Sequence, residues 1–146
     1  MSLDSLYASL ERCERNIQQT QRELNELVEE HKICVQKKNQ YEKQKNGFHN
    51  ILEGERRNLG HLYNLTTRNK LSKKLHIVMN EKFYGRECTK TTDSLDEIYR
   101  TINRIISNLK EKIEEKKRRI QHLNSERQSI KEAIRREIER QRRENQ

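Results

Sequence analysis

Residues 3–34, LDSLYASLERCERNIQQTQRELNELVEEHKIC, decide the fold of this chain. Their apolar side chains recur in steps that alternate between three and four residues, which defines a heptad repeat whose a and d positions form one narrow stripe. The register continues without a slip to residue 62 and predicts one long helix over about residues 3–64. Its main apolar a and d residues are Leu3, Leu6, Leu10, Ile17, Leu24, Leu27, Tyr41, Phe48, Leu52, Leu59 and Leu62.

Such a stripe is stable only when a second helix covers it. The stripe also contains polar residues, which cost stability and usually fix the register or the choice of partner. These polar positions include His31, Lys38, Lys45 and Glu55. Three glycines between residues 47 and 60 lie outside the stripe, and they predict a softer helix over about residues 45–65.

The middle of the chain is less regular. Residues 64–69 are rich in poor helix formers and predict a bend or break, so the first helix either folds back at 64–70 or runs straight to 83. A short amphipathic helix is expected over about residues 69–83. Its apolar residues are Leu71, Leu75, Val78 and Met79. Residues 85–92 are expected to form a loop, with Gly85 as the residue that terminates the short helix.

A second long helix is expected over about residues 94–142, after a capping box formed by Ser94 and Glu97. Its apolar line comprises Leu95, Ile98, Ile102, Ile105, Leu109, Ile113, Ile120, Leu123, Ile130 and Ile134. The line contains an extra step of four at Ile113, which is a stutter that unwinds a supercoil locally. The basic segment 139–146 should fray. We therefore predict a single all-α domain over residues 1–146, an elongated antiparallel helical hairpin that resembles a coiled coil.

Composition agrees with this fold class, because 38% of the residues are charged and only 30% are hydrophobic. A chain so poor in apolar residues cannot fill a wide globular core, so catalysis in a deep pocket is not expected. The net charge is +9, and residues 66–92 and 110–146 carry most of the surplus. This balance permits an anionic partner. The C-terminal stretch, however, interleaves Glu with Arg and lacks the aromatic residues typical of single-strand binders.

No motif for catalysis or for a cofactor is visible. His31 and Cys34 have the spacing of half a zinc site, but no second pair follows, and packing in the stripe explains both. Cys88 lies in the expected loop without a nearby base in the sequence. We expect no enzyme activity, no metal and no cofactor. No apolar run is long enough for a membrane span and no secretory signal peptide is visible, so a reducing cytoplasm is the expected location.

The most suggestive cluster is Phe83-Tyr84-Gly85, which joins two of the seven Phe and Tyr residues to a glycine beside the expected loop. Aromatic residues at a turn either pack the end of the hairpin as a hydrophobic anchor or form a recognition surface for another protein. A small helical hairpin with this motif resembles the Trp-x-Gly class of type VII secretion proteins, with Phe in the place of Trp. Within that class it is similar to the LXG-toxin-associated α-helical (Lap) proteins of Gram-positive bacteria. Residues 83–87 also fit the aromatic-x-x-x-acid export signal of the class, which pairs Phe83 with Glu87.

The resemblance implies a targeting chaperone. It would bind the N-terminal helical domain of an LXG toxin beside a second small helical protein, and it would promote export of the toxin by type VII secretion. Export of the chain itself by the same system is part of this expectation. Two other classes of function stay open. One is a basic coiled coil that binds nucleic acid or an anionic surface, and the other is a structural homodimer.

Overall fold

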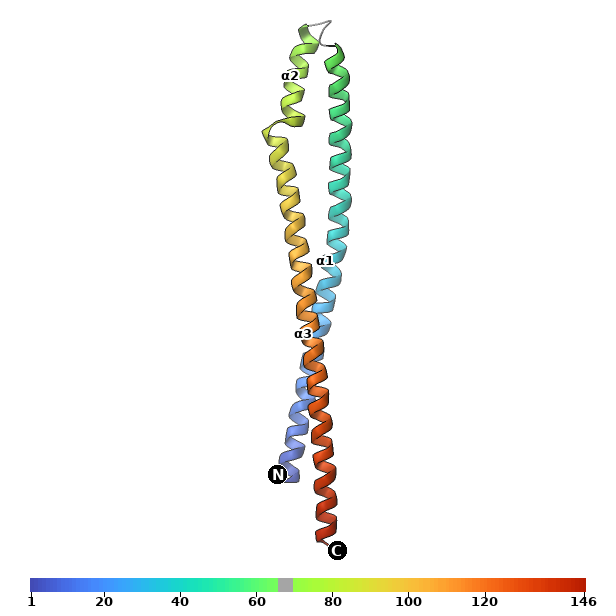
Figure 1. Ribbon diagram of the computed structural model, residues 1–146, viewed down its shortest axis with the longest axis vertical. Helices are drawn as coiled ribbons and strands as arrows, with labels where there is room; N and C mark the ends of the chain where they lie inside the picture. Colours follow the sequence, from blue (N-terminus) through green and yellow to red (C-terminus); the bar gives the residue numbers. More distant parts are fainter. Residues whose placement is uncertain (66–69) are drawn as a thin grey trace. The chain divides into compact units, whose positions relative to one another are not determined.

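The computed structural model describes residues 1–65 and 70–146 and consists of three helices (Figure 1). Helix α1 spans Leu3–Leu65, α2 spans Lys70–Tyr84 and α3 spans Arg86–Glu144. This confirms the all-α helical hairpin. The packing divides the chain into two compact units. The terminal unit comprises residues 1–32 and 107–146, and the central unit comprises residues 33–106.

In the terminal unit, α1 and α3 pack in antiparallel directions. The buried Cys13 thiol donates a hydrogen bond to the carbonyl oxygen of Leu123 over 3.3 Å, and burial raises the pKa of this thiol. Ten residues further along α1, the Glu23 carboxylate accepts a hydrogen bond from Lys116 Nζ at 2.6 Å, which lowers the pKa of Glu23. The residue numbers rise along α1 while those of the partners fall along α3, so the two helices run antiparallel.

The stripe of α1 lies on its packed face throughout. Every a and d position from Leu3 to Leu62 is buried or half-buried, including the polar ones. Thr20 is buried at a d position, and its hydroxyl donates a hydrogen bond to the Asn16 carbonyl oxygen at 2.7 Å. Burial of a polar group is tolerated when such a partner is present.

The stripe of α3 differs from the expected line. Ile98 and Ile105 are 47% and 45% exposed, and the packed positions are Tyr99 and Ile106, the latter only 7% exposed. With this change the steps alternate between four and three along the whole helix, so the predicted stutter at Ile113 is wrong. The packed positions are Cys88, Thr92, Leu95, Tyr99, Ile102, Ile106, Leu109, Ile113, Lys116, Ile120, Leu123, Arg127, Ile130, Ile134, Glu137 and Gln141.

The expected loop over residues 85–92 is also wrong, because α3 begins at Arg86 and the residues of the proposed capping box lie inside the helix. Threonine is a weak helix former, since its hydroxyl competes for backbone groups. Here the hydroxyls of Thr91 and Thr92 donate to carbonyl oxygens four residues earlier, at 3.0 Å each. Thr92 and Cys88 are half-buried on the packed face. Tertiary packing therefore overrides the low helix propensity.

Helix α2 forms over nearly the expected range, but it packs through a different face. Its half-buried residues are His76, Met79 and Phe83, whereas Leu71, Leu75 and Val78 are exposed. The expected bend at residues 64–70 lies mostly outside the described residues. At the other end of the chain, the helix continues to Glu144 through the segment expected to fray, where Arg140 pairs with Glu137 and Glu144.

Gly85 is the bend between α2 and α3. It was expected to adopt the left-handed conformation of a helix terminator, but no residue in the described ranges has a positive φ. Glycine is required for a different reason: a Cβ atom at this position would lie 1.9 Å from the Glu81 carbonyl oxygen. In a straight helix the packed faces of α2 and α3 would point about 150° apart. The bend turns both faces toward α1.

The revised register of α3 places the neighbouring residues Ile105 and Ile106 in different environments, the first exposed and the second buried. We expect Ile106→Ala to lower the free energy of unfolding by about 2–4 kcal/mol, because it removes a buried side chain from the stripe. Ile105→Ala, on the exposed neighbour, should cost less than about 1 kcal/mol. Urea unfolding followed by circular dichroism measures both. An equal or reversed pair of effects would contradict the register.

Candidate functional site

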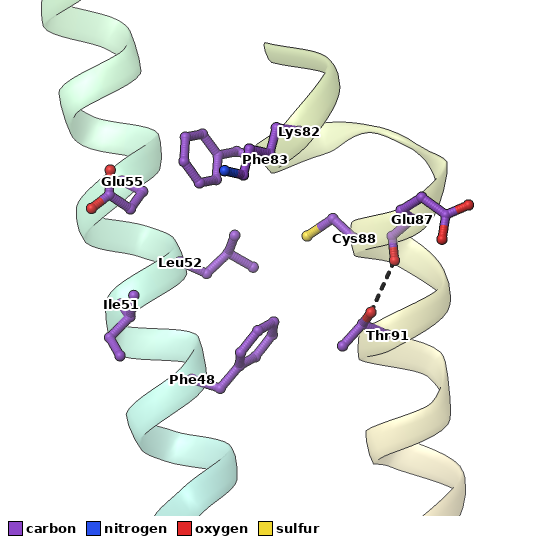
Figure 2. A pocket seen from close by; sticks show the side chains of 9 residues that line it. All are labelled: Phe48, Ile51, Leu52, Glu55, Lys82, Phe83, Glu87, Cys88 and Thr91. Carbon is purple, nitrogen blue, oxygen red and sulfur yellow. Dashed lines mark hydrogen bonds between the residues drawn. The ribbon is translucent and has the colours of Figure 1, made fainter. Parts of the chain in front are cut away.

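The predicted aromatic cluster lies where α2 meets α3, beside a pocket in the central unit. The pocket encloses about 270 Å³ and opens to solvent. Figure 2 shows Phe83 and Glu87, the two ends of the predicted export signal, among the residues that line it. Most of the other side chains around the pocket are apolar. The complete lining is Phe48, Ile51, Leu52, Glu55, Lys82, Phe83, Glu87, Cys88 and Thr91.

Tyr84 and Phe83 are adjacent in sequence but make separate contacts. Tyr84 is exposed, and the guanidinium carbon of Arg56 lies 4.4 Å from its ring centroid, which is a cation–π contact. Arg56 also donates two hydrogen bonds, from Nε and Nη2, to the Phe83 carbonyl oxygen at 3.1 and 3.0 Å. The last carbonyls of a helix lack intrahelical partners. The side chain of Arg56 therefore caps the end of α2 and positions both aromatic residues.

Glu87 has the most exposed side chain of the predicted cluster. Its carboxylate lies 3.8 Å from Lys90 Nζ, one turn further along α3. Both side chains are more than half exposed, so this ion pair is weak. The structure thus places Phe83 and Glu87 at one pocket, Gly85 at the bend and Tyr84 against Arg56.

Polar contacts between α1 and α3 close one side of the central unit. Lys45 Nζ lies 2.8 Å from Asp96, and the Tyr99 hydroxyl donates to Glu42 at 2.6 Å. Lys45 lies 5.0 Å from the centroid of the Tyr99 ring. The hydrogen bond from Lys45 lowers the pKa of Asp96, and the same bond raises the pKa of Lys45. Lys45, an apparent defect of the stripe, therefore has specific partners.

The arrangement suits apolar contact better than reaction chemistry. The Cys88 sulfur, at the pocket, lies 4.0 Å from Arg56 Nη2. Within the ranges that the structure describes, no group of three His, Cys, Asp or Glu residues could hold a metal ion. His31 is half-buried, and its Nε2 atom is buried without a hydrogen-bond partner among the described residues. The pocket can accept apolar side chains.

Sequence analysis missed two contributors to this region, Arg56 and Ile51. Arg56 follows the d position Glu55, which suggests a contact across the pair of helices. Its carbonyl partner is available because α2 ends at the bend at Gly85. The sequence placed the end of the short helix there, but it predicted a loop after Gly85 and not an immediate second helix. Ile51 precedes the a position Leu52. The signal for Ile51 in the sequence was that it is an apolar residue outside the stripe.

No protein family model, curated protein or solved structure matches this chain. None of the helices, over the part of the chain that the structure describes, has an apolar stretch long enough to cross a membrane.

Arg56 provides a test of the aromatic turn. We expect Arg56→Gln to lower the stability of the central unit by about 1–2 kcal/mol, because it leaves the Phe83 carbonyl without its charged donor. Amide hydrogen exchange over residues 83–88 should accelerate. Arg57→Gln, an exposed neighbour, is the matched control and should change neither quantity. Equal effects of the two substitutions would show that the capping contact does not hold the turn.

Proposed function

We propose that this protein is a non-enzymatic helical partner of another protein, a targeting chaperone that binds the N-terminal helical domain of an LXG toxin for type VII secretion. The main support is the apolar surface of the central unit. Several of its Ile, Leu and Val side chains are exposed although the α1 and α3 stripes are already packed. Exposed apolar groups of this kind favour coverage by a second protein.

The specific choice of an LXG toxin depends on the resemblance to the Lap proteins. Phe83 and Glu87 line one pocket, an arrangement compatible with a recognition motif that combines an aromatic group and an acid. A second small helical protein would bind in the same complex. We propose no small-molecule substrate, metal or cofactor, in keeping with a pocket lined mainly by apolar side chains.

Binding to nucleic acid or to an anionic surface is the second candidate function. The observation in its favour is charge: residues 33–106 contain 15 Lys and Arg against 8 Asp and Glu, a net +7. Lys45 and Arg56, however, are engaged in contacts within the unit. Binding through phosphate would weaken steeply as the salt concentration rises. Binding through apolar packing would change little.

Co-expression tests this proposal. We expect the full chain to co-purify with the N-terminal helical domain of an LXG toxin encoded beside it, and the complex to persist from low to high salt in size-exclusion chromatography. The C-terminal toxic domain of the same toxin is the matched control and should not be retained. Absence of a complex at every salt concentration would contradict the toxin assignment. Salt-sensitive retention of DNA in its place would favour the second candidate.

A further inference from the structure

Helix α3 contains two possible packing lines between Cys88 and Leu109, and the structure packs one of them against α1. The observed line is formed by Cys88, Thr92, Leu95, Tyr99, Ile102, Ile106 and Leu109. A second line shares four of these residues and replaces the other three by Thr91, Ile98 and Ile105. Each replacement lies one position earlier, so both lines keep steps that alternate between three and four residues.

The neighbouring residues that distinguish the two lines are similar in chemistry, because each pair joins two threonines or two large apolar residues. The pairs follow one another at intervals of one heptad and are Thr91 with Thr92, Ile98 with Tyr99, and Ile105 with Ile106. This similarity ends with the central unit, since the next two packed residues, Ile113 and Ile120, follow Lys112 and Arg119. The second line is therefore a feature of the central unit.

Both lines continue into the same packed residues of the terminal unit. Ile98 and Tyr99 lie about 100° apart around the helix, so a turn of about 50° about the axis of α3 exchanges the two lines. In the second line, Leu109 is followed by Ile113 after an extra step of four. Such a stutter is absorbed in a coiled coil by local unwinding. The packing beyond Ile113 therefore does not have to change.

Polar contacts with α1 select the observed line. The Tyr99 hydroxyl donates to Glu42 at 2.6 Å, and Lys45 Nζ lies 2.8 Å from Asp96. The ammonium groups of Lys38 and Lys45 lie 5.6 and 5.0 Å from the centroid of the Tyr99 ring. A turn of about 50° toward the second line would carry Tyr99 and Asp96 away from α1 and break these contacts. We name Glu42, Lys45, Asp96 and Tyr99 the polar cluster.

Apolar burial does not favour the observed line strongly. Among the described residues of the central unit, the buried apolar side chains are Leu52, Leu59 and Ile106, and most of the other buried apolar residues lie in the terminal unit. Ile98 and Ile105 stay 47% and 45% exposed, and the second line would bury them in exchange for their neighbours. Because the two registers bury similar apolar groups, the polar cluster decides between them.

We infer that the central part of α3 is a two-register switch. The polar cluster holds it in the observed register, and a turn of the helix brings it into a second register in which Ile98 and Ile105 pack against α1. The inference concerns the chain alone and does not depend on the proposed partner. Its consequence for binding is that the second register withdraws these two isoleucines from the surface and exposes Tyr99 and Ile106 in their place.

Thiol labelling reports the register. A cysteine introduced by Ile105→Cys is exposed in the observed register and packed in the second one, and mass spectrometry of the labelled peptide separates it from the native cysteines. We expect iodoacetamide to label it at least about fivefold more slowly when Tyr99→Ala is added, because this change weakens the observed line alone. Ile98→Ala, which weakens the second line alone, is the matched control and should leave the labelling fast.

A second pair of variants keeps both lines intact. Glu42→Ala combined with Asp96→Ala removes only polar contacts, and it should also slow labelling at position 105. Lys43→Ala combined with Glu97→Ala, on the exposed neighbours of these residues, is the matched control and should not. With the reciprocal reporter, Ile106→Cys, the variants that favour the second register should accelerate labelling. Circular dichroism checks that every variant remains helical.

The direction of the change separates a turn of α3 from a loss of structure. Unfolding would accelerate labelling at both 105 and 106, whereas the turn slows one and accelerates the other. Labelling at position 105 that is unchanged or faster in both the Tyr99 variant and the polar-cluster variant, or that is slowed equally by the controls, would overturn the inference. Slowing that disappears on dilution would show that a second copy covers this position, and it would also overturn the inference.

Discussion

The structure depends on one constraint: each long helix has a single narrow apolar stripe. The residues of each stripe recur at alternating steps of three and four along the whole helix. A chain with 30% hydrophobic residues can bury little more than this. Cys13, Leu123 and Ile106 are buried because two such stripes meet along their length. The polar residues in the stripes are tolerated where partners are present, as Lys116 shows with Glu23. Stability is therefore distributed along the helices.

The same constraint explains the turn. In one straight helix the packed faces of α2 and α3 would point in different directions, so both faces reach α1 only through a bend. The bend requires a residue without a Cβ atom at position 85. Bending frees the Phe83 carbonyl, and Arg56 supplies the donor that replaces the lost helical partner. The aromatic turn and the pocket beside it are thus consequences of how the two helices keep their register.

The all-α hairpin and the register of α1 were predictable because the apolar residues of a heptad repeat are the ones that pack against the partner helix. The register of α3 was not fixed by the pattern, since apolar or aromatic residues occur side by side at 98 and 99 and at 105 and 106. Only the partner helix selects between the two lines. Residues 85–92 look like a loop because glycine and threonine have low helix propensity, yet contact with α1 makes residues 86–92 helical. Those errors hid the exposure of Ile98 and Ile105, because both residues were assigned to the stripe.

Of the candidate site, sequence analysis found Phe83, Tyr84, Gly85 and Glu87, and their role in binding stays a prediction. Arg56 and Ile51 lie one residue after and one residue before positions of the stripe, so they become interpretable only when the packing is known.

Pairing of the two stripes within one chain is tested most directly by a disulfide. Cys13 Sγ lies 3.3 Å from the Leu123 carbonyl oxygen. A chain with Leu123→Cys, Cys34→Ser and Cys88→Ser should therefore form an intrachain disulfide between positions 13 and 123 on mild oxidation, visible by mass spectrometry of the monomer. The matched chain with Asn124→Cys, on the exposed face, should form far less. Only interchain disulfides, or equal yields from the two chains, would contradict the antiparallel pairing.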